Sequence, residues 1–526
     1  MNKEKEIIEY LLKHSIKDEK TLTRAKRLTA KKFGINILSN AEVLKYIREN
    51  KIKINDELKA IFRKRAVRTM SGVAPIAVLT KPYPCPGNCA YCPTEENVPQ
   101  SYLSNEPAVM RAIRCNYNPF IQVQDRIRAL IVNGHEPTKI ELIVIGGTWG
   151  YFPEKYKYWY ILNCFAGANY FSESKKNIKK EKYALNLSIK KIKEKLKEEQ
   201  RKNEKAKYKI IGLTLETRPD YINHQELLEM RELGATRVEI GVQAIDDQIL
   251  KLNKRGSDVK DIVDASALLK NYGFKLTYHI MPGLPGSSSV KDYKMYQQLF
   301  NDERFQPDQI KFYPTVVTKG SLLYRWWKDG KYKPYSDKVL RNLIIKCKLA
   351  TPEYVRIIRL IRDIPGESIV AGNKITNLRQ IMKDEGVKCR CIRCREARGQ
   401  KLKKKDLNLK IIEYKSSNGK EYFIAYESLN HETLYGFCRL RLSVNNFFGL
   451  DTALIRELHV YGELVSLGTQ KKVQHSGLGK MLLNKAEEIA KQNNYKKIAI
   501  ISGVGVRGYY RKFKYKLNKT YMVKNL

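Results

Sequence analysis

Two periods of apolar residues alternate in the central part of this chain. Between residues 73 and 315, short apolar runs rich in β-branched residues alternate with stretches in which apolar residues recur every three or four positions. Near-continuous apolar runs bounded by glycine, proline and charge are typical of parallel strands buried on both faces. Six runs have this character: APIAVLT, KIELIVIGG, KIIGLTLE, RVEIGVQ, KLTYHIMPG and QIKFYP. With helices between them, they predict a parallel α/β sheet, and six units rather than eight favour a partial (βα)6 barrel of the TIM type.

The segments on either side of this repeat have different patterns. In residues 1–70, apolar positions recur at helical spacing between lysines and arginines, which predicts basic amphipathic helices. The repeat itself occupies 71–385. Residues 386–407 form a basic, cysteine-rich connector, and 408–526 predict a smaller α/β domain that begins with a hairpin turning at Asn418-Gly419.

One highly charged stretch, residues 175–207, interrupts the central repeat. Its sequence includes SIKKIKEKLKEEQRKNEKAK. Glutamate and lysine pairs four residues apart predict a long helix. A solvated helical insertion accounts for this segment, and contact with a polyanion is the alternative.

An excess of basic residues narrows the range of partners. The 526 residues include 99 Lys+Arg and 55 Asp+Glu, a formal net charge of +44. Nucleic acid is the commonest partner of so basic a protein, with residues 1–70 as the expected RNA-binding region. Solvated helices, genome composition or thermal adaptation are the alternatives. A membrane is disfavoured because no apolar run approaches the ~20 residues of a span. The N-terminal residues have no signal-peptide core, so we expect a cytoplasmic protein.

Six of the ten cysteines lie in two tight groups, 85–92 and 389–394. Without a secretion signal, this pattern indicates metal or cluster binding in a reducing cytosol rather than disulfides. Of the other four cysteines, those at 115, 164 and 438 are interpreted as packing residues.

The first group lies in KPYPCPGNCAYCPTEEN, directly after the first predicted strand. Thiolates suit zinc or iron–sulfur clusters. Four cysteines normally hold a four-iron cluster, so Cys85, Cys89 and Cys92 would leave one iron open, as a catalytic site requires. Their spacing resembles that of the radical S-adenosylmethionine (SAM) enzymes, in which an aromatic residue, here Tyr91, precedes the last cysteine. A structural zinc loop is the alternative.

Resemblance to the radical SAM enzymes implies a [4Fe-4S] cluster on these cysteines, with SAM on the open iron. One electron from the cluster then yields a 5′-deoxyadenosyl radical. The resemblance also places backbone at the end of the second strand close to SAM's amino group. Polar residues ending the third and fourth strands complete the expected SAM site, although a helix cap or salt bridge would use them equally well. The SAM residues implied in this way are Gly146, Gly147, Thr148, Glu216, Arg218 and Gln243.

A second motif, QHSGLGKMLLNKAEEIAK, lies in the C-terminal region. A glycine-rich loop that opens a helix exposes N–H groups suited to a pyrophosphate. It follows RELHVYGELV and precedes KIAIIS and GVRGYYRKFKY, an order that resembles the Gcn5-related N-acetyltransferases (GNAT). That resemblance implies a catalytic Tyr509 or Tyr510, for which core packing is the alternative. It also implies acetyl-CoA bound by Glu457, Leu458, His459, Val460, Gln474, Gly477, Leu478, Gly479, Lys480 and Tyr510.

Over nearly its whole length the sequence is similar to one family in which both units occur. The shared segments include SYLSNEPAVMRAIRCNYNPF, LTLETRPD, HIMPGLPGSS, RIIRLIRDIPGESIVAGNKITNLRQ and AIISGVGVRGYYRK. They resemble the catalytic subunit of the Elongator complex and its single-chain archaeal and bacterial relatives. The resemblance implies a tRNA wobble-uridine (position 34) carboxymethyltransferase, also termed an acetyltransferase. In the implied mechanism the radical takes hydrogen from the acetyl methyl of acetyl-CoA, the carbon radical adds to C5 of uridine, and thioester hydrolysis leaves a carboxymethyl group.

The same resemblance implies further residues and partners. Lys139, just before the second strand, would contact acetyl-CoA and act in catalysis, with a solvated strand-edge lysine as the alternative. Cys389, Cys391 and Cys394 would hold a structural zinc, with Cys347 as a candidate fourth ligand or a buried apolar cysteine. The expected partners are tRNA and an electron donor, and accessory subunits or a homodimer are left open.

Two other functions are compatible with these residues. A lysine acetyltransferase would use the GNAT domain alone, without the cluster or SAM. A non-catalytic tRNA-binding scaffold would use neither site, but the intact three cysteines and the Gly146-Gly147-Thr148 motif disfavour it.

Overall fold

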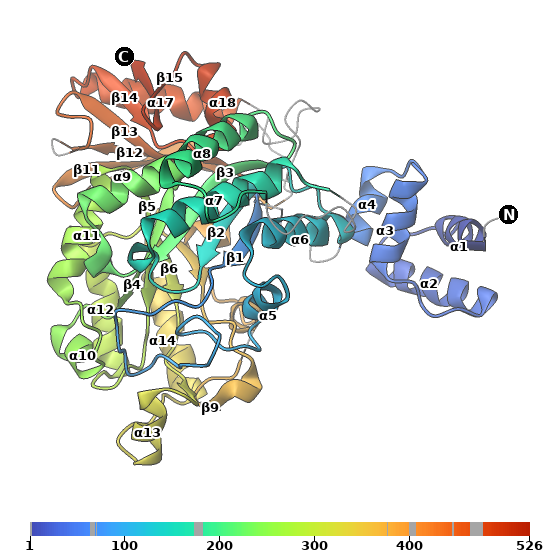
Figure 1. The fold of residues 1–526 in the computed structure, drawn as a ribbon, viewed down its shortest axis with the longest axis horizontal. Coiled ribbons are helices and arrows are strands. Elements are labelled where there is room, and N and C mark those ends of the chain that lie inside the picture. Colours follow the sequence, from blue (N-terminus) through green and yellow to red (C-terminus); the bar gives the residue numbers. More distant parts are fainter. Residues whose placement is uncertain are drawn as a thin grey trace.

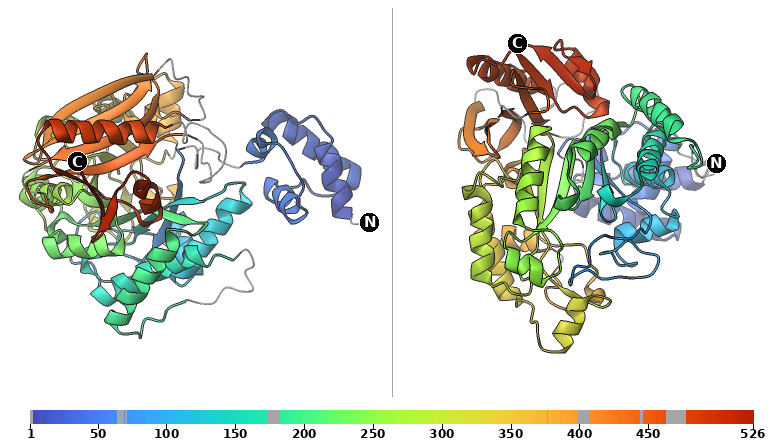
Figure 2. Two further views of the ribbon diagram at one scale, coloured as in Figure 1. Left: turned by 90° about the horizontal axis from the view of Figure 1, so that it is seen from above. Right: turned by 60° about the vertical axis from the view of Figure 1, so that its left-hand side comes forward.

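The computed structural model of the chain describes residues 3–63, 69, 71–172, 182–375, 377–398, 407–443, 446–462 and 477–526. It has three parts: N-terminal helices on one side, a parallel sheet wrapped by helices in the centre, and a second sheet with its own helices at the C-terminal end (Figure 1). Viewed from above, the N-terminal helices stand clear of the other two parts (Figure 2).

Four helices form the N-terminal part, as the sequence predicts. They enclose a small core of their own, in which Leu11, Val43 and Phe62 are fully buried. Asp18, Ser39 and Asn55 cap the last three helices by accepting a hydrogen bond from a first-turn backbone N–H. The four are α1 (Lys3–Leu12), α2 (Glu19–Phe33), α3 (Asn40–Glu49) and α4 (Asp56–Phe62).

The central sheet has seven strands in the order β1-β2-β3-β4-β5-β6-β8, and every pair is parallel. β1 and β8 are its edges, so the sheet is an open partial barrel and the expected fold class is confirmed. The prediction of six strands missed the seventh, β8, because RIIR carries an arginine at each end. The strands are β1 (Ala74–Leu79), β2 (Lys139–Ile145), β3 (Lys209–Thr217), β4 (Arg237–Gln243), β5 (Lys275–Ile280), β6 (Gln309–Phe312) and β8 (Arg356–Arg359).

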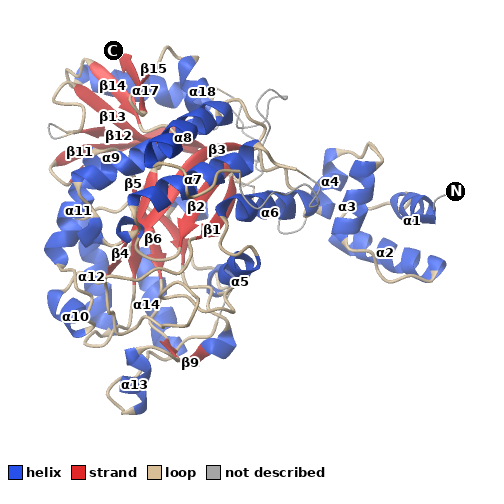
Figure 3. Cartoon of the chain, viewed as in Figure 1, coloured by secondary structure: helices blue, strands red, loops and turns tan. Residues whose placement is uncertain are grey.

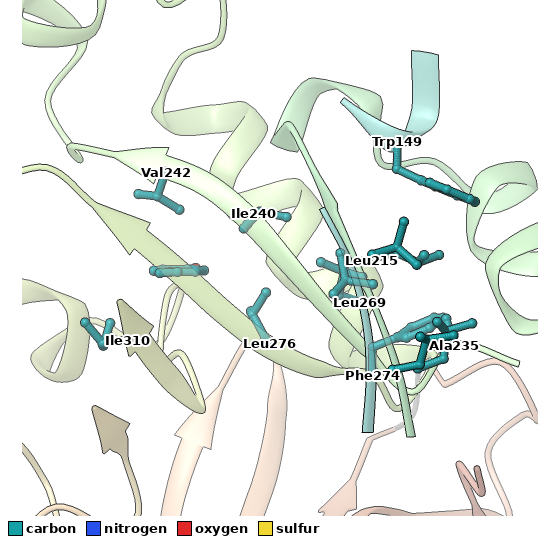
Figure 4. Packing of buried hydrophobic residues seen from close by; sticks show 14 of the residues in the cluster. Trp149, Leu215, Ala235, Ile240, Val242, Leu269, Phe274, Leu276 and Ile310 are labelled. Carbon is teal, nitrogen blue, oxygen red and sulfur yellow. The ribbon is translucent and has the colours of Figure 1, made fainter. Parts of the chain in front are cut away.

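Helices cover the outer face of this sheet (Figure 3). Outward-pointing apolar side chains of the strands, such as Ile240 and Val242 of β4, Leu276 of β5 and Ile310 of β6, pack in a continuous core (Figure 4). Burial of this core is the main stabilising contribution to the barrel. The longer helices are α6 (Pro119–Val132), α7 (Glu154–Asn169), α8 (Ile189–Asn203), α9 (His224–Leu233), α11 (Val259–Asn271), α12 (Ser289–Asn301) and α14 (Asp337–Leu349).

Shorter elements lie in the connections. They are α5 (Pro107–Arg114), α10 (Asp247–Leu252), α13 (Leu322–Lys328), α15 (Leu378–Asp384), α16 (Ile392–Arg395), the two-stranded pair β7 (Val317–Thr318) and β9 (Ile369–Ala371), and the 3-10 turns η2 (Trp149–Tyr151), η4 (Pro219–Tyr221) and η5 (Gly366–Ser368).

The inner face of the barrel is polar, which corrects the expectation of strands that are apolar on both faces. In β4 the side chains alternate, with Val238, Ile240 and Val242 outward and Arg237 and Glu239 on the opposite face. The same alternation runs through β5 and β6. Successive side chains of a strand point to opposite faces, so charged residues at every second position all enter the barrel interior.

The predicted insertion is also less solvated than expected. Its helix α8 packs against α7 and buries Ile192 and Leu196. Just beyond α8, Glu204 forms an ion pair with Arg507 of the C-terminal part, at 3.4 Å. The insertion therefore contacts both the barrel and the C-terminal domain.

The C-terminal part has a seven-stranded sheet in the order β10-β11-β12-β13-β14-β16-β15. The first hairpin turns at Ser417 and Asn418, both with positive φ, rather than at the expected Asn418-Gly419. Positive φ at both central residues is the type I′ geometry that matches the strand twist. The elements are β10 (Leu407–Ser416), β11 (Gly419–Ser428), β12 (Leu434–Leu442), β13 (Thr452–Val460), α17 (Leu478–Gln492), β14 (Lys497–Ile500), η8 (Val504–Val506), α18 (Arg507–Arg511), β15 (Lys516–Asn518) and β16 (Tyr521–Asn525).

This second sheet packs against the amino ends of the barrel strands. Arg456 of β13 pairs with Asp308, just before β6, with Nη1 and Oδ1 2.9 Å apart, and also donates to the carbonyl of Phe274, just before β5. Gly503 lies so close to β3 that a Cβ there would overlap the carbonyl oxygen of Ile211. Charged side chains and closely apposed backbone thus fix the two domains together.

Candidate functional site

The three-cysteine loop lies at the carboxyl end of the barrel, between β1 and α5. The Sγ of Cys85 lies 3.8 Å from the Oγ1 of Thr148, which follows β2. Arg255, in the loop after α10, donates its Nη1 to the Sγ of Cys89 at 3.8 Å and its Nη2 to the carbonyl of Gly241 at 2.7 Å. The loop is therefore held over the ends of the strands, where such folds place their chemistry.

The chemistry of these thiols suits a shared cluster. Cys89 accepts a hydrogen bond from Cys92, and this bond, with the nearby charge of Arg255, lowers the pKa of Cys89 to about 5. The three sulfurs do not form the compact group that one metal ion needs, whereas a multi-iron cluster takes its cysteines on different irons.

Two glycines after β2 leave room beside this loop. Gly146 and Gly147 have φ of +124° and +112°, in the region that favours glycine. A Cβ at Gly146 would overlap the hydroxyl of Thr80, whereas a Cβ at Gly147 would meet no atom within 4 Å. The backbone at Gly147 is thus open to a ligand.

Several buried polar atoms around the loop have no hydrogen-bond partner among the described residues. Buried polar groups are almost always paired in proteins, so such a cluster indicates a missing ligand. The guanidinium of Arg218 packs on Gly87 of the cysteine loop and pairs with Asp220 at 2.8 Å. The unpaired atoms are Arg218 Nη1, Gln243 Oε1 and Ser257 Oγ. These residues fit a cofactor with several polar groups.

Sequence reasoning missed Arg255 and Ser257. Both follow α10 in NKRGS, where no strand end or motif singles them out. Ala90 donates its N–H to the carbonyl of Asn253 at 3.0 Å, which brings this segment against the cysteine loop.

A chain of charged side chains runs down the barrel interior from the cysteine end. Glu216 of β3 lies 3.3 Å from the Nδ1 of His279, whose Nε2 lies 2.9 Å from Glu239. Arg237 contacts Glu239 at 3.6 Å and Glu141 at 2.8 Å. Burial would lower the pKa of His279, but the two glutamates outweigh burial and raise it. The interior therefore carries alternating charges held in fixed positions.

The chain of charges continues into the C-terminal domain. Lys275, the first residue of β5, lies 3.3 Å from Glu457 of β13, which Arg439 of β12 also contacts at 3.1 Å. Burial would raise the pKa of Glu457, but the charges of Lys275 and Arg439 lower it to about 2. RVEIGVQ, KLTYHI and QIKF show the alternation that could have revealed this interior from the sequence.

In the C-terminal sheet, β13 and β14 diverge. β14 ends at Ile500 after pairing with Thr452–Ile455, so Glu457 to His459 of β13 lie beyond the paired length of the two strands. His459 donates its Nε2–H to the carbonyl of Ser71, 3.0 Å away. A diverging strand exposes backbone groups to which an extended ligand can add like a further strand.

The helix α17 begins beside the end of β13, where a Cβ at Gly479 would lie 3.8 Å from the side chain of Val460. Gly477 precedes α17 with φ of +89°, and no side chain of the described residues caps its first N–H groups. A Cβ at Gly479 would overlap the hydroxyl of Tyr509. Leu478 and Lys480 lie in the first turn, while Gln474 lies outside the described residues. The open helix end suits a pyrophosphate, with Tyr509 beside it.

The two candidate tyrosines have different surroundings. Tyr510 is buried in the apolar core of the C-terminal domain, where burial raises its pKa. Its ring lies edge-on to that of Tyr509, with centroids 5.3 Å apart. Tyr509 is the one placed at the helix end.

Lys139 is the first residue of β2, so it lies at the amino ends of the barrel strands, which face the C-terminal domain. It pairs in register with Lys209, which contacts the backbone near Gly505. Burial lowers the pKa of Lys139 to about 8.

The second cysteine group forms a compact site. The sulfurs of Cys389, Cys391 and Cys394 all lie within 4.8 Å of one another, which a single tetrahedral ion requires. Cys347 lies outside this group, buried in α14 within the barrel core.

The two sets of site residues lie at opposite ends of the barrel strands. The cysteine loop follows the carboxyl ends, whereas the C-terminal domain packs on the amino ends. β3 spans nine residues, so roughly 25 to 30 Å of strand separates them. None of the helices that the structure describes is both long and apolar enough to cross a membrane.

Three protein-family models match consecutive parts of the chain. The Radical SAM superfamily matches residues 83–289, the Radical_SAM C-terminal domain matches 307–386, and the Acetyltransferase (GNAT) family matches 389–515.

Similar proteins cover almost the entire chain. A tRNA uridine(34) acetyltransferase of Methanocaldococcus infernus is 41% identical over 99% of this chain and 98% of that protein. One of Dehalococcoides mccartyi is 43% identical over 88% of this chain and 100% of its own length. Elongator complex protein 3 of Homo sapiens is 36% identical over 96% of this chain and 93% of that protein. The solved structure of Methanocaldococcus infernus Elp3 with an N-terminal deletion has a TM-score of 0.73, with 38% identity over 87% of this chain and 100% of that one.

Proposed function

Since this chain belongs to the family of the tRNA uridine(34) acetyltransferases and Elongator complex protein 3, we propose that it carboxymethylates C5 of the wobble uridine of tRNA. Its radical SAM domain and its GNAT domain act on one reaction. The observation that carries the proposal is the polar barrel interior, which joins the cysteine end to the diverging strand of the GNAT domain through buried charges.

The carboxyl end of the barrel supports a radical-generating site. Cys85, Cys89 and Cys92 would hold a [4Fe-4S] cluster, with Arg255 donating to one of the thiolates. SAM would lie against the open backbone at Gly147 and use the unpaired polar atoms beside it. Its polar partners would be Gly146, Thr148, Glu216, Arg218 and Gln243. When bound, the cluster and SAM supply a 5′-deoxyadenosyl radical.

The GNAT end supports acetyl-CoA binding. The backbone of Glu457 to Val460 would pair with the pantetheine arm, and the N–H groups after Gly477 would hold the pyrophosphate. Lys139, on the facing edge of the barrel, adds a positive charge for the phosphates. Tyr509 is the tyrosine positioned beside the helix end, and Tyr510 supports it from the core.

The cysteine loop and the GNAT site lie at opposite ends of the barrel strands, so we assign a function to the polar barrel interior between them. The proposed reaction requires the acyl group and the uridine base to reach the radical at the cysteine end. Lys311, His279 and Arg237 are hydrogen-bond donors in the barrel interior, and Glu239 pairs with all three. A dry, pre-oriented set of donors stabilises negative charge that develops on a carbonyl oxygen.

The distribution of domains supports a tRNA substrate. We assign residues 1–70 as the tRNA-binding helical region, 71–385 as the radical SAM barrel, 386–407 as a zinc-binding connector on Cys389, Cys391 and Cys394, and 408–526 as the GNAT domain. The net charge of +44 favours a polyanion, and an anticodon loop already presents unstacked bases.

Anaerobic reconstitution tests this function. The protein is supplied with iron, sulfide, SAM, a reductant, acetyl-CoA and a tRNA transcript, and the nucleosides are analysed by mass spectrometry. We expect 5-carboxymethyluridine, lost in Cys89→Ala and kept in Cys164→Ala, whose sulfur is buried in α7 away from the loop. Acetyl-lysine without the nucleoside would instead support a lysine acetyltransferase, and tRNA binding without any product a scaffold.

A further inference from the structure

A surface pocket lies on the outer side of the cysteine loop. It has a volume of about 320 Å3 and is bounded by the end of α10, the loop 283–287 after β5, the helix α13 and the segment that follows it. Outside the loop 283–287, the residues that line it are Leu252, Trp326, Lys331, Tyr332, Lys333 and Tyr335. None of these residues belongs to the cluster, SAM or acetyl-CoA sites described above.

The two tyrosines of the pocket are held in place by their hydroxyls. Tyr332 donates to the carbonyl of Gly283 at 2.7 Å, and Tyr335 donates to Asp292 at 2.7 Å. Asp292 in turn accepts from the N–H of Gly283 at 2.8 Å and from Ser287 at 2.6 Å. The hydroxyl ends point into the protein, so the rings are fixed before any ligand arrives.

Gly283 allows one of these rings to lie flat on backbone. Its φ is +81°, and a Cβ there would lie 3.3 Å from two ring carbons of Tyr335, closer than side chains normally pack. The floor of the pocket is therefore a rigid aromatic surface on bare backbone.

The charges around the pocket are positive. Lys331 and Lys333 are exposed at its edge. Lys331 has a weak, solvent-exposed contact with Asp329 at 3.5 Å. The carboxylate of Asp292 is occupied by Tyr335, Ser287 and the backbone of Gly283. Aromatic faces beside lysines form the combination that binds single-stranded nucleic acid, because every base stacks on an aromatic ring and every phosphate attracts a cation.

The pocket adjoins the radical end of the barrel directly. Leu323 of α13 donates its N–H to the carbonyl of Ala90, between the cluster cysteines, at 2.7 Å. Thr94 donates to the carbonyl of Gly320 at 3.2 Å, just before α13. A nucleotide in the pocket would thus lie one layer of chain away from the cysteine loop.

We propose that this pocket binds an unpaired nucleotide of the RNA substrate next to the base that is modified. The base stacks on Trp326 and Tyr335, and Lys331 and Lys333 contact the adjacent phosphates. A volume of this size accommodates one nucleotide. The proposal rests on the proposed function, since it takes an RNA as the substrate. It adds a binding site for a nucleotide of the anticodon loop.

Adjacent tryptophans in α13 provide a matched test. Trp326 lines the pocket, whereas Trp327 lies outside it and stacks on Tyr324 with centroids 6.0 Å apart. Binding of a fluorescein-labelled anticodon stem-loop RNA is measured by anisotropy. We expect W326A to raise the Kd about tenfold, the usual loss for one base–aromatic stack. W326F should stay within about twofold of the unmodified protein, and so should W327A.

A second arm tests the phosphate contacts and guards against misfolding. K333A should lower the slope of log Kd against log salt concentration by about one, as removal of a phosphate contact does. If W326A does not fold, photocrosslinking of the unmodified protein replaces it. Stem-loops carrying 5-iodouridine beside position 34 should then crosslink to the peptide that contains Trp326 or Tyr335.

The outcomes separate the two proposals. Equal effects of W326A and W327A, or crosslinks confined to other peptides, would overturn the pocket and leave the proposed function standing. Failure of the unmodified protein to bind the stem-loop at all would overturn both.

Discussion

Lys275, the first residue of barrel strand β5, and Glu457, on the diverging strand β13 of the GNAT domain, form a largely buried ion pair with Nζ and Oε1 3.3 Å apart. This contact joins the polar interior of the barrel to the strand that would bind acetyl-CoA. It makes the position of that strand depend on the barrel. The two domains therefore form one unit rather than two enzymes on a flexible linker.

Breaking that ion pair from one side should destabilise the protein strongly. K275M leaves Glu457 buried with Arg439 as its remaining ion-pair partner among the described residues, and removal of one partner of a buried pair typically costs about 3–5 kcal/mol. The double variant K275M/E457Q should cost less than the sum of the single variants. Thermal unfolding of all three measures this coupling, with the exposed pair of Lys260 and Asp264 as the control. Additive effects would contradict the coupling.

A single Cβ at the domain interface should separate the domains. A methyl group at Gly503 would overlap the carbonyl oxygen of Ile211 in β3, whereas one at Gly508 would meet no atom within 4 Å. We expect Gly503→Ala to lower the unfolding temperature by several degrees and to weaken acetyl-CoA binding. Gly508→Ala should leave both unchanged. Indistinguishable behaviour of the two variants would rule out close docking at this point.

Acetyl-CoA affinity should depend on pH through Lys139. Burial lowers the pKa of this lysine to about 8, so it carries its charge below that pH and loses it above. We expect the Kd of acetyl-CoA to rise as the pH increases from 7 to 9, because the phosphates lose an attractive charge. In K139R the charge persists and the rise should disappear, as calorimetric titration can show. Parallel pH profiles would mean that Lys139 does not contact the ligand.

Lys270 should make the domain interface more stable at alkaline pH. It donates to the carbonyl of Gln306 and to the hydroxyl of Ser416, and it lies near the charges of Glu421, Asp308, Arg456 and Arg441. Burial lowers its pKa to about 7, below the 10.5 of an exposed lysine. Between these values the unfolded chain binds the extra proton, so the free energy of unfolding rises with pH, by up to about 1.4 kcal/mol per unit.

Comparison with K270M isolates this effect. The variant has no proton to lose at this position, so its unfolding free energy should rise less between pH 7 and 10 than that of the unmodified protein. Urea titrations at several pH values provide the measurement. An equal rise in both proteins would show that Lys270 is charged in the folded state throughout.

The second cysteine group should bind one zinc ion that the protein needs for stability. Cys391→Ser removes one of three clustered sulfurs, and the bound zinc should fall from one equivalent toward none, with a lower unfolding temperature. Cys347→Ala should retain the metal because that sulfur lies in the barrel core, outside the cluster. Elemental analysis of both variants decides the point. Loss of zinc in Cys347→Ala would make it the fourth ligand after all.

Local sequence accounts for much of the architecture. The runs from APIAVLT to QIKFYP match six barrel strands. The content of apolar residues and the glycines and prolines that bound each run are properties of the segment itself. β8 escaped prediction because its arginines are acceptable only where β6 pairs with it and Glu396 contacts Arg356. The buried face of α8 was missed for the same reason, since α7 supplies the surface that covers it.

The site residues likewise divide into those that local sequence identifies and those that only tertiary contacts bring together. The spacing of Cys85, Cys89 and Cys92 and the glycines around Gly477 are continuous motifs, so the chain alone identified the chemistry and both classes of cofactor. Only the folded molecule could decide which side chains from distant segments meet, such as Arg255 at Cys89 and Glu457 at Lys275. Only the folded molecule placed the two centres at opposite ends of a charged interior, because parallel strands send every second side chain inward and gather residues hundreds of positions apart onto one face.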